Sequence, residues 1–193
     1  PSYNNPVTIR RVVLAVREHV PDVIVVDDGS AEEGRAAIAA LAEEGIATVH
    51  HRARNGGKGA AVKDALRLAR DAGFTHALQV DADGQHTLTD IPRMLSASRA
   101  APAALVLGMP VFDETAPKAR VVGRRITIFW TRLEVGGGAI ADPMCGFRIY
   151  PLPISADVTV WGDRMDFDPE IAVRLVWEGV PTRNVETRVR YVS

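Results

Sequence analysis

The chain has 193 residues, of which 47% are hydrophobic, and its formal net charge is −1. This length suits one hydrophobic core and the charge provides no field that attracts nucleic acid, so we expect a single domain over residues 1–193 and no nucleic-acid partner. The single cysteine, Cys145, excludes an internal disulfide, is expected to be a small buried residue, and fits a cytoplasmic protein. No apolar run approaches the roughly 20 residues that a membrane-spanning helix needs.

Along the chain, short apolar segments alternate with segments of helical periodicity. Helices are predicted over residues 7–20, 31–44, 59–72, 91–100, 119–135 and 169–177. Strands are predicted over residues 23–26, 48–50, 76–80, 104–107, 145–150 and 185–192. This alternation is typical of an α/β fold in which helices cover both faces of a mostly parallel, Rossmann-like sheet.

Both ends of the sequence have the composition of interrupted elements. Residues 1–6 read as a loop that follows a strand, and residues 185–192 still alternate like a strand close to the last residue. We therefore expect a strand before Pro1 and further segments after Ser193.

An acidic turn follows the predicted strand at residues 76–80. Asp81 and Asp83 are separated by one residue, Gly84 permits a tight turn, and Gln85 adds a neutral oxygen. Ligands of open α/β sheets bind at the carboxyl ends of strands, where two such carboxylates can reach one divalent cation. The pattern favours a site for Mg²⁺ or Mn²⁺ and a nucleotide diphosphate, although a solvated turn has the same composition.

A second acidic turn follows the predicted strand at residues 23–26. Asp27 and Asp28 could accept hydrogen bonds from a ribose or a base, and Ser30 is expected to cap the next helix. Either turn alone is compatible with an ordinary loop. Two acidic turns at the same edge of one sheet favour a binding site.

A glycine-rich turn at residues 55–59 precedes another predicted helix. Its glycines allow close approach of the backbone to a ligand, and Lys58 at a helix N-terminus would favour an anion. The spacing is neither that of a Walker A loop nor that of a dinucleotide-binding fingerprint, so a flexible turn is the other interpretation.

Five motifs occur in order: Pro1-x-Tyr3-Asn4, VVDDGS at 25–30, NGGKGAA at 55–61, DADGQH at 81–86 and DPMCGFR at 142–148. Together they resemble the family-two glycosyltransferases, and within them the dolichol- or polyprenyl-phosphate mannose and glucose synthases and their bacterial relatives. The likeness spans nearly the whole chain. It implies a GT-A fold and a metal-dependent, inverting transfer of a sugar from a UDP- or GDP-sugar donor.

The resemblance also implies roles for individual residues. The pocket for base and ribose would be lined by Pro1, Tyr3, Asp27 and Asp28, and bordered by Lys58. The metal and diphosphate group would be Asp81, Asp83 and Gln85, with Asp83 at the centre of catalysis. The nucleotide-sugar half would span residues 1–110 and the acceptor half residues 111–193.

The stretch from residue 118 to residue 132 contains five basic residues and no acid: Lys118, Arg120, Arg124, Arg125 and Arg132. A lipid phosphate is already an anion, so an acceptor of this kind needs positive charge rather than a base. Arg124 and Arg125 are the predicted ligands of such a phosphate, with Arg148 as a third candidate.

The same stretch has an apolar stripe formed by Val122, Ile126, Phe129 and Leu133, with Trp130 beside it. We expect this stripe to pack in the core rather than to lie on a membrane. For the full-length protein, the lipid-linked acceptor implies a position at the inner face of a membrane, with peripheral contact to it.

Three alternatives remain at this point. A hydroxyl acceptor, in a polysaccharide or glycolipid, would need a general base, for which Asp166 is the candidate, while Asp168 is expected to cap the following helix. A nucleotidyltransferase would use a similar sheet, but no glycine-rich loop with an arginine follows a first strand. A non-catalytic nucleotide-sugar-binding module is the third alternative.

Overall fold

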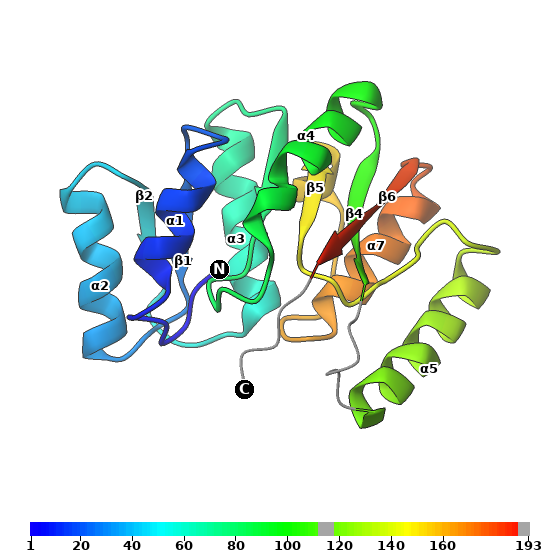
Figure 1. Cartoon of the computed structure of the whole chain (residues 1–193), viewed down its shortest axis with the longest axis horizontal. Helices are drawn as coiled ribbons and strands as arrows, with labels where there is room; N and C mark the ends of the chain where they lie inside the picture. The colour runs from blue at the N-terminus through cyan, green and yellow to red at the C-terminus, as the bar shows by residue number, and fades with distance from the viewer. Residues whose placement is uncertain (112–117, 189–193) are drawn as a thin grey trace.

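The computed structural model describes residues 1–111 and 118–188, with the side chains of residues 118–123 and 125 excepted. Its helices are α1 (Ile9–Arg17), α2 (Glu32–Glu43), α3 (Lys58–Asp71), the 3₁₀ turn η1 (Leu88–Asp90), α4 (Ile91–Ala100), α5 (Lys118–Glu134), α6 (Ile154–Asp157) and α7 (Phe167–Trp177). Its strands are β1 (Ile24–Asp27), β2 (Thr48–His51), β3 (His76–Gln79), β4 (Leu105–Val111), β5 (Arg148–Pro151) and β6 (Thr182–Arg188). Figure 1 shows their arrangement.

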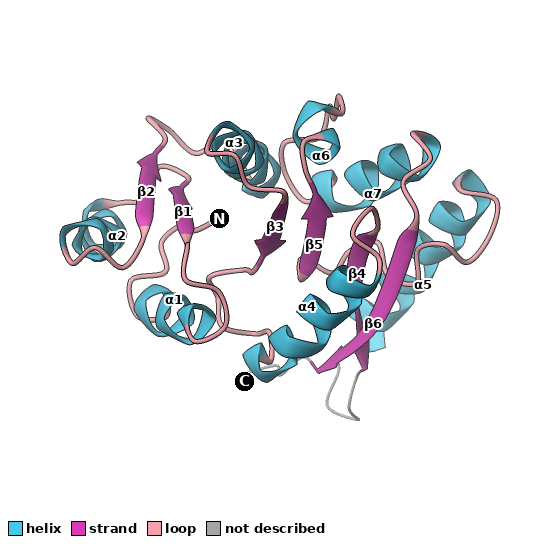
Figure 2. Ribbon diagram, turned by 90° about the horizontal axis from the view of Figure 1, so that it is seen from above, coloured by secondary structure: helices cyan, strands magenta, loops and turns pink. Residues whose placement is uncertain are grey.

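The described strands form two sheets that lie side by side (Figure 2). One contains β1 and β2, which are parallel, and the other has the order β3-β5-β4-β6. In the second sheet β4 and β6 are parallel, whereas β5 is antiparallel to both of its neighbours. The alternation of elements predicts a mostly parallel sheet, but this sheet is mixed. The chain enters β5 after α5 and a loop, and β5 runs opposite to β3 and β4.

Helices cover both faces of the sheets, as the sequence predicts. Helices α1 and α4 lie on one face, and α3, α6 and α7 lie on the other (Figure 2). Between β1 and β3 is an apolar cavity of about 310 Å³, lined by side chains of α1, α3 and both strands and by Pro1. Ser2 already pairs in parallel with Asp27 of β1. The expectation of a strand before Pro1 stays a prediction.

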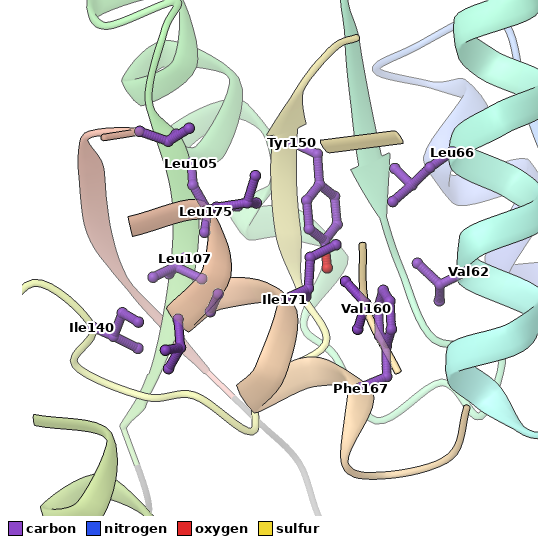
Figure 3. Close-up of a cluster of buried hydrophobic side chains, with 13 residues drawn as sticks. Val62, Leu66, Leu105, Leu107, Ile140, Tyr150, Val160, Phe167, Ile171 and Leu175 are labelled. Atoms are coloured by element: carbon purple, nitrogen blue, oxygen red, sulfur yellow. The ribbon is translucent and has the colours of Figure 1, made fainter. Parts of the chain in front are cut away.

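The largest group of buried apolar side chains joins α3 and α7 to the second sheet (Figure 3). Phe167 and Ile171 of α7 pack with Val62 and Leu66 of α3 beside Tyr150 of β5. Burial of each such side chain contributes roughly 1.5–3 kcal/mol. This packing holds the first turn of α7 against the first turn of α3, where the candidate site lies.

The beginning of α2 differs from the prediction. Ser30 makes no capping hydrogen bond, because its hydroxyl oxygen accepts a bond from the Asn4 backbone N–H at 2.9 Å. The amide oxygen of Asn4 instead accepts from the N–H of Ala31, at 2.8 Å. The prediction that Ser30 caps the helix is wrong, because Asn4, 27 positions before Ala31, supplies the acceptor.

The apolar stripe of α5 is not part of the core. Ile126, Phe129, Trp130 and Leu133 have exposed fractions of 56%, 63%, 57% and 65%. Helix α5 lies at the periphery of the molecule (Figure 1). The prediction of core packing is wrong at these positions because helical periodicity reports an apolar face and not what covers it. The side chain of Val122 lies outside the described part.

Other differences concern the ends of elements. Helix α7 begins two residues earlier than predicted, and β6 begins at Thr182 and is described as far as Arg188. Within residues 1–111 and 118–188, no helix has both the length and the apolar character that crossing a bilayer requires.

Candidate active site

The acidic turn at residues 81–85 directly follows β3. Gly84 adopts φ +74°, and the Oδ1 atom of Asp83 accepts a hydrogen bond from the N–H of Gln85 at 2.9 Å. The hydroxyl of Thr8 donates to the carbonyl of Ala82 at 2.6 Å and fastens the turn to the segment before α1. The turn thus holds Asp83 exposed to solvent while Asp81 points inward.

Lys58 connects this turn to the start of α7. Its Nζ atom lies 2.8 Å from Oδ2 of Asp81 and 2.8 Å from Oδ2 of Asp168. Nε2 of His86 lies 3.4 Å from the same oxygen of Asp81. The side chains of Lys58 and Asp81 are 18% and 21% exposed, whereas that of Asp168 is 1% exposed. A chain of alternating charges therefore runs from the surface turn into the core.

The charges in this chain stabilise one another. Burial alone would lower the pKa of Lys58, but the carboxylates of Asp81 and Asp168 outweigh it and raise that pKa. Burial alone would raise the pKa of Asp81, but the charge of Lys58 and the hydrogen bond from His86 lower it. The contact between Lys58 and Asp81 therefore favours the charged form of each side chain.

Asp168 is held by charge rather than by capping. It lies in the first turn of α7, and no side-chain hydrogen bond caps this helix. Its carboxylate makes no hydrogen bond of good geometry among the described residues, so Lys58 and the more distant Arg148 Nη1, at 3.9 Å, compensate its charge. The prediction that Asp168 caps the helix is wrong.

Arg148 is part of the scaffold of the site. It is fully buried, and its guanidinium donates to the backbone carbonyls of Cys145, Pro143 and Asp168 at 2.5–2.6 Å. These bonds fix the segment around Gly146 to the start of α7. Arg148 is therefore no candidate for an acceptor phosphate, because it has no exposed surface with which to meet one.

Gly146 permits the contact between Lys58 and Asp81. A Cβ atom at this position would lie closer than 3.0 Å to Lys58 Nζ and to Asp81 Oδ2. The backbone of the DPMCGFR segment at Gly146 thus lies directly against this ion pair. The neighbouring Cys145 is buried, as predicted, and burial raises the pKa of its thiol to about 11, so it stays protonated.

The first acidic turn is engaged inside the protein. Asp27 is fully buried; its Oδ1 accepts from the Ser30 N–H at 2.9 Å and its Oδ2 lies 2.8 Å from His51 Nδ1. Burial would raise the pKa of Asp27, but the hydrogen bonds from Ser30 and His51 lower it.

Asp28 binds the glycine-rich turn. Its carboxylate accepts from the N–H groups of Gly56 and Gly57 at 2.9 and 2.8 Å and is also paired with Arg52. Gly29, at φ +73°, lets the two turns touch, since a Cβ there would collide with the backbone of Arg54. The sequence predicts both turns as ligand-binding loops, and the structure brings them together as partners of each other.

Two carboxylates of the second turn fit a divalent cation. Oδ1 of Asp81 is buried and has no hydrogen-bond partner within the described part of the chain, and Asp83 is exposed on the same turn. No cluster of three or more His, Cys, Asp and Glu side chains suited to a metal occurs among the described residues. Magnesium-type sites often combine one or two carboxylates with phosphate oxygens, and Asp81, Asp83 and the amide of Gln85 match that type.

The remaining predicted residues lie around this centre. The nitrogen of Pro1 is within electrostatic reach of Asp81, Lys58 and Asp28, whereas the side chain of Tyr3 is half exposed. Asp166 is exposed in the turn before α7, where its Oδ1 accepts from the Arg164 N–H at 2.9 Å.

Arg124 of α5 pairs with the buried carboxylate of Asp142, which lies four residues before Gly146. This pair ties the described part of α5 to the segment under the Lys58–Asp81 contact. The side chain of Arg125, the second predicted acceptor ligand, lies outside the described part.

Sequence reasoning missed Asp168, His86 and Gly146 as parts of the site. His86 directly follows the acidic turn and could have been included with it. Asp168 is 110 positions from Lys58, so only the packing of α7 on α3 reveals their contact.

The sequence profile of the Glycosyl transferase family 2 matches residues 1–152. The chain belongs to this family, as its motifs predict. It is similar to an undecaprenyl-phosphate mannosyltransferase of Micrococcus luteus, with 37% identity over 163 residues. It is also similar to a polyprenol monophosphomannose synthase of Mycolicibacterium smegmatis, with 31% identity over 159 residues. Both alignments cover 78% of this chain, and 63% and 59% of those proteins. The chain thus spans about three fifths of their length.

Solved structures of a glucosyl-3-phosphoglycerate synthase from Mycobacterium tuberculosis have the same fold. One of them has a TM-score of 0.76 and 17% identity, and covers 100% of this chain and 70% of that one. Another, with a TM-score of 0.75, is a complex of that synthase with Mn²⁺ and UDP-glucose. At this identity the likeness shows the fold alone, and it confirms the predicted GT-A fold.

Proposed function

We propose that this chain is the catalytic domain of an inverting glycosyltransferase that moves a sugar from a UDP- or GDP-sugar to a polyprenyl-phosphate-like acceptor. Family membership and the two relatives named for undecaprenyl-phosphate and polyprenol support this choice. The observation that carries it is that the chain combines a charged strand-end turn, at Asp81–Gln85, with a basic helix that exposes an apolar stripe, α5.

The donor binds at the acidic turn after β3 and beside the turn at the end of β1, whose carboxylates hold the surrounding loops. Asp81, Asp83 and Gln85 would hold Mg²⁺ or Mn²⁺, and a cation bound there would supply positive charge to offset that of the departing diphosphate. Lys58 adds positive charge at the N-terminus of α3, where backbone N–H groups also favour an anion. Asp28 keeps the glycine-rich turn in place through Gly56 and Gly57 and thereby shapes the pocket for the nucleoside beside Pro1 and Tyr3.

The acceptor approaches from the side of α5. A phosphate monoester is an anion before it attacks, so it needs positioning by cations and no general base. Arg124 and Arg125 serve this purpose, and the Arg124–Asp142 pair joins them to the segment that carries Gly146. In this proposal Asp166 shapes the turn before α7 through its bond to Arg164 and takes no proton.

The exposed stripe of α5 contacts an anionic bilayer in which the acceptor's lipid tail lies. Ile126, Phe129, Trp130 and Leu133 present apolar and aromatic surface at helical spacing, on a helix rich in arginine. Such a combination is typical of helices that lie in the membrane interface. The protein would work at the cytoplasmic face of that membrane.

The acceptor assignment is tested by steady-state transfer to a short polyprenyl phosphate. Arg124→Ala is expected to raise the acceptor KM about tenfold while donor affinity stays unchanged. Arg132→Ala, an exposed arginine of the same helix, is the matched control and is expected to behave like the wild type. Asp142→Asn removes the charged partner of Arg124 but keeps the arginine itself. It therefore distinguishes loss of the Arg124 charge from loss of the Arg124–Asp142 contact.

A hydroxyl acceptor would produce the opposite pattern. Asp166→Asn would then lower kcat by more than about a hundredfold, and the arginine changes would be harmless. That result would show that the acceptor is a polysaccharide or glycolipid rather than a lipid phosphate. Binding of a nucleotide sugar without any transfer or hydrolysis would instead show that the chain is a non-catalytic binding module.

The bilayer contact is tested by sedimentation with vesicles of phosphatidylglycerol and phosphatidylcholine. Phe129→Ser together with Leu133→Ser is expected to reduce the bound fraction several-fold, because about 25 cal/mol per Å² of apolar burial is lost. Val7→Ser, at a site that is 87% exposed and outside α5, should bind as the wild type does. Equal binding by all three proteins would contradict the role of α5.

A further inference from the structure

Lys58 is shared between two carboxylates with different surroundings. Asp81 lies in the surface turn, is 21% exposed and has a second oxygen, Oδ1, without a partner in the described part of the chain. Asp168 is 1% exposed, and its Oδ1 atom lies 3.9 Å from Nη1 of the fully buried Arg148. Both carboxylates are 2.8 Å from the same Nζ atom.

The four charges balance as they stand. Arg148 and Lys58 are positive, and Asp168 and Asp81 are negative, so the buried group carries no net charge. A divalent cation at Asp81 would add two positive charges beside Lys58. At an effective dielectric constant near 20, like charges about 4 Å apart repel by several kcal/mol, so this arrangement does not persist.

Lys58 can resolve the conflict without leaving the site. Its side chain has four rotatable bonds, and the second carboxylate is already at contact distance, so a small rotation moves its charge fully to Asp168. Arg148 cannot neutralise Asp168 in place of Lys58, because its hydrogen-bond donors are committed to three backbone carbonyls.

We propose that Asp168 is a positioning residue that takes Lys58 from Asp81 when a divalent cation binds there. Lys58 competes with the cation for Asp81, and Asp168 weakens that competition by offering the ammonium group a second partner. The inference rests on the proposed function only in that Asp81 is a cation ligand. It does not depend on the sugar or on the acceptor.

The test is Mn²⁺ binding measured by calorimetry, in the absence of nucleotide and acceptor. Lys58→Met removes the competing charge and is expected to tighten Mn²⁺ binding about tenfold, a modest share of the Coulomb repulsion. Asp168→Asn leaves Lys58 with Asp81 alone and is expected to weaken binding about fivefold. In the double variant, the change at residue 168 should have no further effect, because no lysine is left to be held.

The matched control is a second lysine–aspartate pair that involves α3. Lys63 of α3 pairs with the Asp163 side chain, which is 59% exposed, at 2.6 Å. Lys63→Met and Asp163→Asn change the same charges and are expected to leave Mn²⁺ affinity unchanged. Circular dichroism establishes that each variant is folded.

Several results would overturn the inference. Unchanged or weaker Mn²⁺ binding by Lys58→Met does so, and this measurement decides the matter even where Asp168→Asn fails to fold. Equal losses for Asp168→Asn with and without Lys58 would make Asp168 a purely structural residue. Absence of Mn²⁺ binding by both the wild type and Lys58→Met also contradicts the inference. Failure to transfer sugar to a polyprenyl phosphate, with Mn²⁺ affinities as expected, would refute the proposed function alone.

Discussion

Two turns with nearly the same composition follow β1 and β3, yet their carboxylates have different surroundings. At the end of β1, both oxygens of Asp27 and both oxygens of the following Asp28 have partners within the protein. In the turn after β3, Oδ1 of Asp81 has none in the described part, and Asp83 is exposed. An acidic residue at a strand end therefore indicates a ligand site only where the fold leaves its oxygens available.

The largest effect is expected where the oxygens are available. Asp81→Asn should lower sugar transfer by about a hundredfold to a thousandfold, because the proposed cation ligand and the counter-charge of Lys58 are lost together. Initial rates with saturating donor measure this loss. Asp71→Asn, an exposed aspartate of α3, is the control. If Asp81→Asn kept activity within a few-fold of the wild type, the available oxygens of Asp81 would not mark a ligand site, and the two turns would not differ in function.

In the first turn we expect a loss of stability instead. Asp28→Asn removes a buried charge that binds Gly56, Gly57 and Arg52, and should lower the free energy of unfolding by about 2–3 kcal/mol. Urea unfolding measures this change, with Asp22→Asn on the surface as the reference. A variant of normal stability that no longer binds nucleotide would show that Asp28 contacts the ligand directly.

A smaller effect is expected beneath the second turn. Gly146→Ala places a methyl group against the Lys58–Asp81 pair and should reduce transfer about tenfold, the cost of displacing two charged groups. Gly138→Ala is the control, because no atom lies within 4 Å of a Cβ there. If Gly146→Ala were fully active, the pair would have room to move and its geometry would matter little.

The smallest effect concerns acid stability of the first turn. The folded-state pKa of Asp27 is lowered, so its stabilising contribution is present above about pH 4 and is lost as the pH falls below that value. His51→Gln should reduce this loss by less than about 1 kcal/mol, since one of the hydrogen bonds that lower the pKa disappears. Unfolding free energies at pH 3 and pH 6 measure it, with His50→Gln as the exposed counterpart. Identical pH dependence in all three proteins would mean that His51 does not act on Asp27.

Local patterns were sufficient to predict the six strands, the longer helices and the two acidic turns, but not η1 or the four-residue helix α6. The β-branched run before Asp27 and the Asp-x-Asp-Gly spacing at Asp81 each specify a strand end and a turn, because the chemistry lies within a few residues. The family and its fold followed from the same motifs.

The errors arise where a partner lies far along the chain. Ser30 has the composition of a cap, but Asn4 supplies the acceptor. Asp168 has the position of a cap, but Lys58 and Arg148 claim its charge. The stripe of α5 has the period of a core helix and lies on the surface. In each case the sequence reports what a residue can do, and the tertiary packing decides which partner it meets.

The buried polar groups of β5 also bear on how this strand finds its place during folding. All four residues of β5 are buried, so both of its faces meet apolar surroundings and alternation of side chains cannot distinguish one alignment from the next. A slip by one residue would move Arg148 away from its three carbonyls and the Tyr150 hydroxyl away from Gln79, to which it donates at 2.9 Å. Each stranded donor or charge would cost more than a misplaced apolar side chain. In β5 the guanidinium and the phenol therefore select the native alignment with β3 and β4, and apolar replacements of both would be expected to populate shifted strands.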